Sequence, residues 1–264
     1  MIIHVHPDLD AITCVALASV DVDYVHMLPA GIEKLPDVCP CHGRPLDPRE
    51  RILDHPLGDK GRLDPDGTRH AAACAMPEAR FADPDLLAEV DEQDSTGKVD
   101  QPRFSLAAVM AGLREEGRGR GLRGQELDYY VLDLGSRVIR GLLALHRARQ
   151  AADAAIDDVP IVEVGTYRFA ILIDNGSPSL GIALARRGVC GAIYAEGANL
   201  GVTRYPGYAE PDLRKLASQL PGWFIHSAGF LACWGSRKNP AQTPPPAGTP
   251  QTVHDLLQLL HQIF

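Results

Sequence analysis

The sequence predicts an α/β protein of two lobes. Short apolar segments typical of strands, at residues 1–5 and 24–28, flank an apolar, helix-like stretch at 12–18. A long amphipathic segment follows at 125–158, and a new alternation of strand-like and helix-like segments begins at Ile161. We therefore expect a mostly parallel sheet in the N-terminal lobe, a smaller α/β lobe at the C-terminus, and a long helix that joins them.

The expected domain boundaries follow from these segments. The first lobe covers 1–124, the connecting helix 125–158 and the second lobe 159–264, and a chain of 264 residues is long enough for two modest cores. The Pro-rich stretch NPAQTPPPAGTP at 239–250 is expected to be a linker to a short terminal helix, with Thr252 as the N-cap of that helix.

Composition limits the partners and the compartment. The net charge of −8 disfavours a duplex nucleic-acid binder, whereas a small or single-stranded substrate is compatible with it. The six cysteines are scattered, which favours a reducing compartment over a disulfide scaffold. No stretch approaches the ~20 apolar residues of a membrane span, and the start MIIHVHPDLD does not resemble a signal peptide. We expect a cytoplasmic protein without a membrane partner; a homodimer is left open.

The segment HVHPDLDA carries the strongest chemical signal. It places His4, Asp8 and Asp10 between the end of the first strand and the start of the next helix. Ligands of open parallel sheets bind beyond the carboxyl ends of strands, so three such side chains at this point favour a binding site. The alternative is that Asp8 is a helix N-cap and His4 an ordinary strand residue.

Two further acidic clusters occur in the same lobe. ERILDHP contains Asp54 and His55 at the end of a strand-like run, and EVDEQDSTG contains Asp91 and Asp94 at the end of a helix-like run. Carboxylates gathered in one place repel one another unless a cation neutralises them, and mixed oxygen and nitrogen ligands suit manganese or a similar ion. Two such ions can hold a hydroxide and both reacting oxygens of a phosphoryl group.

The order of these groups resembles the DHH phosphoesterase superfamily, whose members split phosphodiester or phosphoanhydride bonds. The pattern HxxxDxD resembles the first family motif, the Asp-His pair resembles two residues of the naming triplet, and DSTG contains the late ligand. The resemblance implies two divalent ions, Mn²⁺ with Mg²⁺ or Co²⁺ as alternatives. The residues that match metal ligands are His4, Asp8, Asp10, Asp54 and Asp94, and His55 would assist.

The second family motif is harder to place. The segment DVCPCHGRPLDPRERILDHP is similar to the pattern in which an Asp-Val strand end precedes Asp-Pro and the triplet, so the resemblance puts a bridging metal ligand at Asp37, with Asp47 as the alternative. Cys39, Cys41 and His42 in the same segment have the chemistry of zinc ligands. Because a structural zinc site usually needs a fourth ligand and a wider Cys spacing, we favour a loop beside the site.

The chain departs from the family at the last residue of the triplet, which is Pro56 instead of histidine. The family histidine binds near the substrate phosphate. His70, in GTRHAAA, would replace it in one hypothesis, and the role would be lost in the other. The predicted catalytic residues are therefore His55 and His70.

The second lobe contains a partial match of its own. WFIHSAGFLACWG resembles the His-small-small-Gly-Phe segment of a branch of metal-dependent exonucleases related to the melanocyte-proliferating-gene protein. The resemblance implies that a substrate phosphate is bound by His226 and by nearby cations, for which the candidates are Arg204, Arg237 and Lys238. The alternative is a buried turn with surface arginines.

Together these patterns predict a metal-dependent phosphoesterase. We expect it to hydrolyse a phosphodiester or phosphoanhydride bond through water activated by two metal ions, in a phosphorylated small molecule or a short single-stranded nucleic acid. Two alternatives remain. One is a non-catalytic module that senses a nucleotide or a metal, which Pro56 favours. The other is a pyrophosphatase or phosphomonoesterase that uses the same ions.

Overall fold

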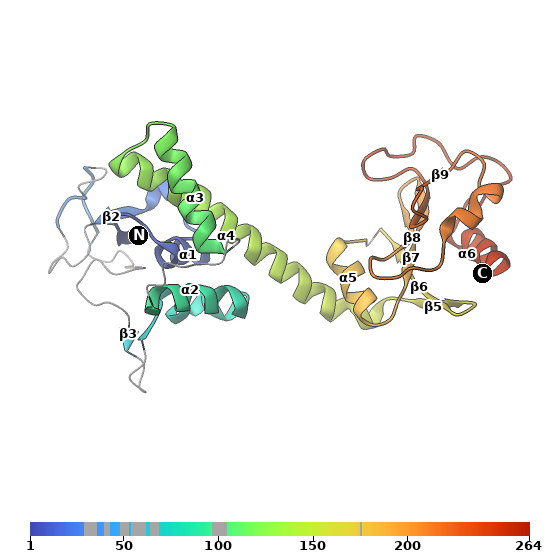
Figure 1. Cartoon of the computed structure of the whole chain (residues 1–264), viewed down its shortest axis with the longest axis horizontal. Coiled ribbons are helices and arrows are strands. Elements are labelled where there is room, and N and C mark those ends of the chain that lie inside the picture. The colour runs from blue at the N-terminus through green and yellow to red at the C-terminus, as the bar shows by residue number, and fades with distance from the viewer. Residues whose placement is uncertain are drawn as a thin grey trace. The chain divides into compact units, whose positions relative to one another are not determined.

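The chain forms two compact units, residues 1–147 and 148–264 (Figure 1). The structure, a computed structural model, describes residues 1–28, 36–39, 43–47, 53, 62–63, 69–96, 105–174 and 176–264. Of residues 62–63, 69–70 and 95 it describes the backbone alone. The division between the units falls within helix α4 (Gly124–Ala155), whereas the sequence assigns this helix to a separate connector.

The first unit begins with two parallel strands joined through a helix. β1 (Ile2–His4) pairs with β2 (His26–Leu28), and α1 (Leu9–Leu17) and the 3₁₀ helix η1 (Val22–Tyr24) lie between them in the chain. The carbonyl of Ile2 accepts the N–H of Leu53 at 2.9 Å, so a second segment borders β1. The strand, helix and strand expected in this region are observed, with bounds that differ by a few residues.

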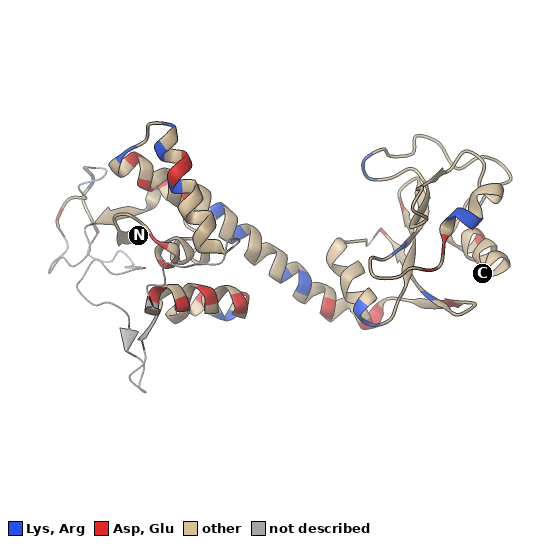
Figure 2. Ribbon diagram, viewed as in Figure 1, with Lys and Arg blue, Asp and Glu red and all other residues tan. Residues whose placement is uncertain are grey.

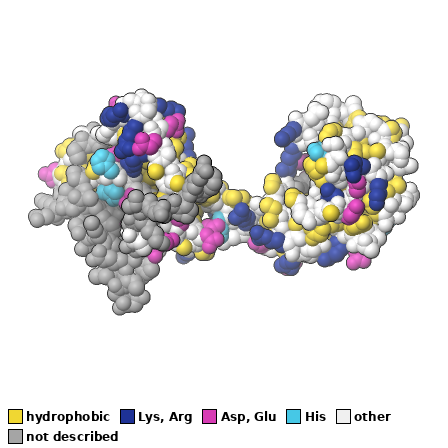
Figure 3. Space-filling view, in the orientation of Figure 1, with side chains coloured by type: hydrophobic (Ala, Val, Ile, Leu, Met, Phe, Trp, Pro, Cys, Tyr) yellow, Lys and Arg dark blue, Asp and Glu magenta, His cyan; other side chains and the backbone are white. Residues whose placement is uncertain are grey.

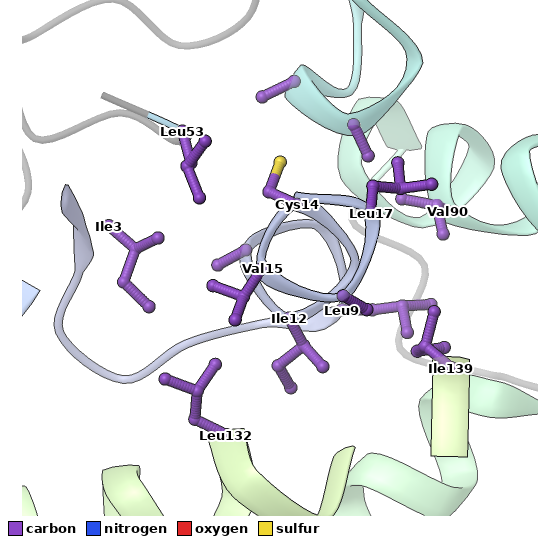
Figure 4. Close-up of a cluster of buried hydrophobic side chains, with 14 of the residues drawn as sticks. Ile3, Leu9, Ile12, Cys14, Val15, Leu17, Leu53, Val90, Leu132 and Ile139 are labelled. Carbon is purple, nitrogen blue, oxygen red and sulfur yellow. The ribbon is translucent and has the colours of Figure 1, made fainter. Parts of the chain in front are cut away.

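Helix α1 lies at the centre of the first unit's core. Every residue from Leu9 to Leu17 is buried, as expected for a helix whose residues are nearly all apolar; Asp10 and Thr13 are the polar ones. Figure 4 shows the helix end-on, enclosed by side chains from β1, from α2 (Pro84–Thr96) and from α4. The labelled neighbours include Ile3, Leu53, Val90, Leu132 and Ile139. A helix so enclosed provides a rigid base for the residues at its N-terminus.

The remaining elements of the first unit surround this core. They are β3 (Arg62–Leu63) and β4 (Arg69–His70), which are antiparallel, the 3₁₀ helices η2 (Ala72–Ala75) and η3 (Pro77–Phe81), and α3 (Leu106–Gly119). Helix α2 starts with Pro84 after Asp83, whose Oδ1 accepts the N–H of Asp85 at 3.0 Å. Acidic residues recur along α2 (Figure 2), and two of them bear on the site described below.

Six strands form one sheet in the second unit, in the order β5-β6-β7-β8-β10-β9. β6 and β7 are parallel and are connected through α5 (Pro178–Arg186), while the other neighbouring pairs are antiparallel. The strands are β5 (Ile161–Val164), β6 (Tyr167–Ile173), β7 (Gly191–Glu196), β8 (Asn199–Arg204), β9 (Phe224–Ile225) and β10 (Leu231–Trp234). The protein is therefore mixed α/β, and the described strands of the second unit are mainly antiparallel.

The rest of the second unit comprises the 3₁₀ helices η4 (Ile156–Asp158) and η5 (Leu213–Gln219) and the terminal helix α6 (Val253–Ile263). Thr252 caps α6 as the sequence predicts. Its side chain accepts the N–H of Asp255, and the Asp255 side chain accepts the N–H of Thr252, which completes a capping box.

The Pro-rich stretch 239–250 packs on the second unit and is not a free linker. The indole N–H of Trp234 donates to the carbonyl of Thr243 at 2.8 Å, and that of Trp223 donates to Oγ1 of Thr249 at 3.2 Å. Two indole hydrogen bonds hold the stretch in place, and proline content alone does not reveal them. Across the described parts of the chain, no helix combines the length and apolar character needed to cross a membrane.

Candidate functional site

The loop between β1 and α1 brings His4 and Asp8 together. Oδ1 of Asp8 accepts the N–H of Ala11 at 3.0 Å, so Asp8 is the N-cap of α1. Its other oxygen, Oδ2, lies 3.6 Å from Nε2 of His4. Burial opposes ionisation of Asp8, but hydrogen bonds from His4 and Ala11 outweigh this effect and lower the pKa of the carboxyl. Asp8 thus caps the helix and also carries a charge toward His4.

The backbone sets the orientation of the His4 ring. Nδ1 of His4 lies 2.7 Å from the carbonyl oxygen of Val5. Because a carbonyl only accepts, Nδ1 carries a hydrogen. When the ring is protonated, Nε2 also carries one and donates to Asp8, which is the hydrogen bond that lowers the pKa of that carboxyl. In the neutral ring Nε2 has a lone pair instead, and a metal ion between Nε2 and Oδ2 would replace the proton. A backbone bond to the other ring nitrogen is also typical of metal-binding histidines.

Asp10 lies two residues after Asp8, in the first turn of α1, and is almost fully buried, with 3% of its surface exposed. Both of its oxygens accept backbone hydrogens at 2.8 Å, Oδ2 from Ala72 and Oδ1 from Ala73. The two donors form the first turn of η2, so Asp10 caps a helix that is distant in sequence. The thiol of Cys14 also donates to Oδ1, at 3.9 Å.

A pocket of about 210 Å³ lies beside these residues in the first unit. Asp8 and Asp10 line it from the start of α1, and Asp94 lines it from the last turn of α2; Leu9, Val90 and Gln93 complete the lining. Pockets that enclose a whole small ligand usually exceed about 300 Å³, so this one is large enough for ions and a phosphate group. Three sequence-predicted carboxylates therefore converge on one pocket.

The electrostatics of neighbouring groups support this convergence. The pKa of the Cys74 thiol is raised to about 11, first by burial and then by the nearby carboxylates of Asp91, Asp10 and Asp94. Because three carboxylates affect the pKa of one thiol, negative charge is concentrated in this part of the first unit. Such a charge favours the binding of cations.

Gln93 is a pocket residue that the sequence patterns do not single out. Among the residues that the structure describes, its buried Oε1 atom has no hydrogen-bond partner. Val90, Gln93 and Asp94 are spaced i, i+3 and i+4 on α2 and so share a face, which is the signal that identifies Gln93 in retrospect. An unpaired oxygen beside three carboxylates fits a hard divalent ion such as Mn²⁺ or Mg²⁺.

Asp91, the other acid of the EVDEQDSTG segment, has a structural contact. Its Oδ1 accepts the N–H of Ala71 at 2.8 Å, immediately before η2. Asp91 and Asp10 together hold three successive N–H groups, at positions 71, 72 and 73. The chain thus fixes η2 against both α1 and α2.

Other predicted site residues are not brought to the pocket or are not described. Asp37 is exposed, next to the bridge between Val38 and Pro45, and is not among the described residues that line the pocket. Asp54 and His55 lie outside the described residues. The backbone of His70 belongs to β4, but its side chain is not described. Although Asp8, Asp10 and Asp94 line one pocket, the described part of the chain contains no group of three His, Cys, Asp or Glu side chains that is already arranged to hold a metal ion.

The zinc alternative in the CPCHG segment concerns Cys39, Cys41 and His42. Cys39 is buried and disulfide-bonded, so its sulfur is not available as a zinc ligand. Cys41 and His42 lie outside the described residues.

In the second unit, Arg204 and His226 both contact Ala228, in the turn between β9 and β10. The N–H of Ala228 donates to Nδ1 of His226 at 3.1 Å, and the carbonyl of Ala228 accepts from Nη2 of Arg204 at 3.5 Å. Nη1 of Arg204 donates to the carbonyls of Ala209 and Pro211. Because Nδ1 of His226 accepts, the neutral ring carries its hydrogen on Nε2, where it can donate to an anion.

Arg237 lies apart from this pair. It binds Glu196 at 2.8 Å and the carbonyl of Gly176 at 2.5 Å. Arg237 follows β10 near the start of β8, whereas Arg204 is the last residue of β8, so the two arginines lie at opposite ends of the β8–β10 ladder. Lys238 is exposed next to Arg237. The structure therefore groups Arg204 with His226, and Arg237 with Lys238.

Comparisons with known proteins identify no family. Neither a protein-family model nor a curated protein matches the chain.

Three solved structures overlap the chain at low identity. RecJ from Thermus thermophilus in complex with Mg²⁺ is 17% identical with a TM-score of 0.24, and the match covers 88% of this chain and 46% of RecJ. The Mn²⁺ complex of the same RecJ is 15% identical with a TM-score of 0.23, and the match covers 98% of this chain and 56% of RecJ. An uncharacterized protein from Helicobacter pylori G27 is 10% identical with a TM-score of 0.28, over 100% of this chain and 98% of that protein.

This chain spans about half the length of RecJ. TM-scores of 0.23 to 0.28 do not establish a shared fold.

Proposed function

We propose that the protein is a metal-dependent phosphoesterase of the DHH type, with its metal site at the pocket formed by Asp8, Asp10 and Asp94. The observation that carries the proposal is the convergence of these three carboxylates from α1 and α2 on one pocket. His4 and the sequence-predicted ligand Asp54 would complete the set of metal ligands. Mn²⁺, Mg²⁺ or Co²⁺ bound there would polarise a phosphoryl oxygen and lower the pKa of a water molecule.

The chain's own residues contribute position and charge. Asp10 is held by two N–H groups of η2, so its carboxylate is pre-organised and does not need to reorient when a cation arrives. Asp8 is held at one oxygen by the N-terminus of α1, which leaves Oδ2 toward His4. In the second unit, Nε2–H of His226 would donate to a substrate phosphate oxygen, in a role that the neutral ring can perform.

The metal site can be tested without turnover. Titration of the purified protein with Mn²⁺, followed by calorimetry, should give saturable binding. Asp94→Asn is expected to weaken Mn²⁺ affinity about tenfold or more. Glu92→Gln is a matched control, because Glu92 is an exposed acid on the same helix and does not line the pocket. A wild-type protein that binds no Mn²⁺, or equal losses in both variants, would contradict the proposed site.

The activity can be tested with a panel of phosphate compounds. A diester, a monoester, pyrophosphate and a short single-stranded oligonucleotide would each be incubated with Mn²⁺, Mg²⁺, Co²⁺ or Zn²⁺. Hydrolysis of the diester or oligonucleotide is the expected result, and hydrolysis of pyrophosphate or the monoester alone would favour the second enzyme alternative. Metal binding without turnover of any compound would instead favour a sensing module, in keeping with Pro56.

A further inference from the structure

A buried carboxylate on α4 holds the loop that joins His4 to Asp8. Asp128 has 2% of its surface exposed, and its Oδ2 accepts the backbone N–H of His6 at 3.0 Å. Its Oδ1 lies 3.1 Å from Nδ1 of the same residue. One carboxylate therefore binds both the backbone and the ring of His6, which stands midway between the two proposed metal-binding side chains.

A second side chain secures the next residue of the loop. Nη2 of Arg114, on α3, donates to the carbonyl of Pro7 at 2.8 Å, and its Nη1 lies 3.7 Å from Oδ1 of Asp128. The guanidinium compensates the buried charge of Asp128, which would otherwise be costly. Asp128 of α4 and Arg114 of α3 thus form an ion pair whose members bind two successive loop residues, His6 and Pro7.

These contacts stabilise a loop whose backbone conformation is unfavourable on its own. His6 has φ of 55°, in the left-handed region that residues with a Cβ rarely occupy. Its ring is 73% exposed, so packing of the side chain does not impose this conformation. Histidine side chains of the first unit reach the surface beside basic and acidic ones on the face shown in Figure 3. The hydrogen bonds to Asp128 are therefore what compensates the strain.

We propose that Asp128 is a positioning residue for the metal site. It holds His6 in the left-handed conformation and so directs His4 and Asp8 toward each other, at the observed 3.6 Å between Nε2 and Oδ2. The proposal rests on the proposed function, since it assigns to Asp128 a supporting role for the ligands of that site. Removal of supporting partners typically weakens metal affinity by about 10- to 100-fold.

Graded variants of Asp128 test this role. Asp128→Asn keeps one acceptor for the N–H of His6 and is expected to weaken Mn²⁺ affinity moderately, whereas Asp128→Ala removes both contacts and should weaken it about tenfold or more. Asp133→Asn is the matched control, because Asp133 lies on the same helix in an exposed pair with Arg137. Circular dichroism of each variant establishes that the fold is retained.

A change at His6 separates positioning from a purely structural role. Glycine adopts positive φ without strain, so His6→Gly should keep Mn²⁺ affinity within about twofold, whereas His6→Ala should lose affinity. In the His6→Gly background, Asp128→Asn should reduce Mn²⁺ affinity less than it does in the wild-type background, because the backbone strain that Asp128 compensates is gone. A merely structural Asp128 would give the same loss in both backgrounds.

The outcomes separate this proposal from the proposed function. If wild-type protein binds no Mn²⁺, the proposed function and this proposal both fail. If wild type binds Mn²⁺ and Asp128→Ala, correctly folded, binds it equally tightly, only the positioning role is overturned. Should Asp128→Ala not fold, the Asp128→Asn variant and its combination with His6→Gly decide in the same way. Amide exchange at His6, expected to be faster in Asp128→Asn, reports the loop without metal.

Discussion

Oδ2 of Asp10 accepts the backbone N–H of Ala72 at 2.8 Å, which ties the first turn of α1 to the start of η2. Asp10 is thus a structural residue whatever else it binds. Asp10→Ala should lower the free energy of unfolding by about 2 kcal/mol or more, because two N–H groups in the core lose their acceptor. Asp10→Asn retains one acceptor and should lose less. Urea denaturation measures both, and an unchanged midpoint in Asp10→Ala would contradict the capping role.

Asp54 resembles a metal ligand of the DHH motif by its place in the sequence, and it lies outside the described residues. We predict that Asp54→Ala removes most Mn²⁺ binding, because the remaining carboxylates would not neutralise the charge of the ion. Calorimetric titration with Mn²⁺ measures this. Asp85→Asn, an exposed acid at the start of α2, serves as the control. Unchanged Mn²⁺ binding in Asp54→Ala would contradict the assignment of Asp54 as a metal ligand.

The second unit offers a prediction about substrate contacts. Alanine variants of Arg204, His226 and Arg237 should leave Mn²⁺ affinity unchanged, because these residues belong to a different unit from the pocket. His226→Ala should raise KM for an active substrate, and kcat should fall as well if the contact strengthens in the transition state. Arg204→Ala should also lower Tm, since three backbone carbonyls lose a donor. Loss of metal with substrate affinity intact would refute the assignment.

Acid should destabilise the second unit through Asp212. Hydrogen bonds from the Arg214 side chain and backbone lower the pKa of this carboxyl to about 2, below its usual value of 3.8. Its stabilising contribution is therefore complete above the unfolded pKa and is lost as the pH falls from about 4 to 2. Asp212→Asn should have a lower Tm than wild type at pH 5, and the difference should shrink toward pH 2. A difference that is constant with pH would contradict this account.

His70 is predicted to take part of the role that Pro56 cannot perform. In an active enzyme, His70→Ala should reduce kcat by roughly a hundredfold or more with metal content near normal, as expected for a lost acid or hydrogen-bond donor. The alternative is a histidine that stabilises the start of the following helix. Full turnover with a lowered Tm would support that alternative and reject the catalytic role.

Local sequence patterns predicted the helices whose signals, apolar spacing or an N-cap residue, lie within the helix itself or directly before it. The spacing of apolar residues placed α4 and α5, and Thr252 marked the start of α6 because a hydroxyl N-cap is a local signal. His4, Asp8 and Asp10 could be found together because they lie in one short segment of the sequence, from the end of β1 to the first turn of α1. Asp94 could be associated with them only through the family pattern, since nothing local reveals that α2 packs on α1.

The features that the sequence did not reveal depend on tertiary contacts. The amides of Ala72 and Ala73 belong to residues without polar side chains, so no motif marks them. In the sequence, Asp128 is one polar residue among several in a long helix. Only the fold shows that its carboxylate accepts the N–H of His6. The antiparallel strands β8 and β10 are short and are separated by a long segment, which prevents their pairing from being read from periodicity.

Both tryptophans of the chain, Trp223 and Trp234, belong to the second unit, where their indole groups hold the 239–250 stretch. Intrinsic fluorescence therefore reports on that unit and not directly on the unit that contains the carboxylate pocket. Circular dichroism, which detects helices in both units, would respond to each. If the units unfold separately, Mn²⁺ should shift the dichroism transition and leave the fluorescence transition in place; a common shift would mean that the two units unfold as one.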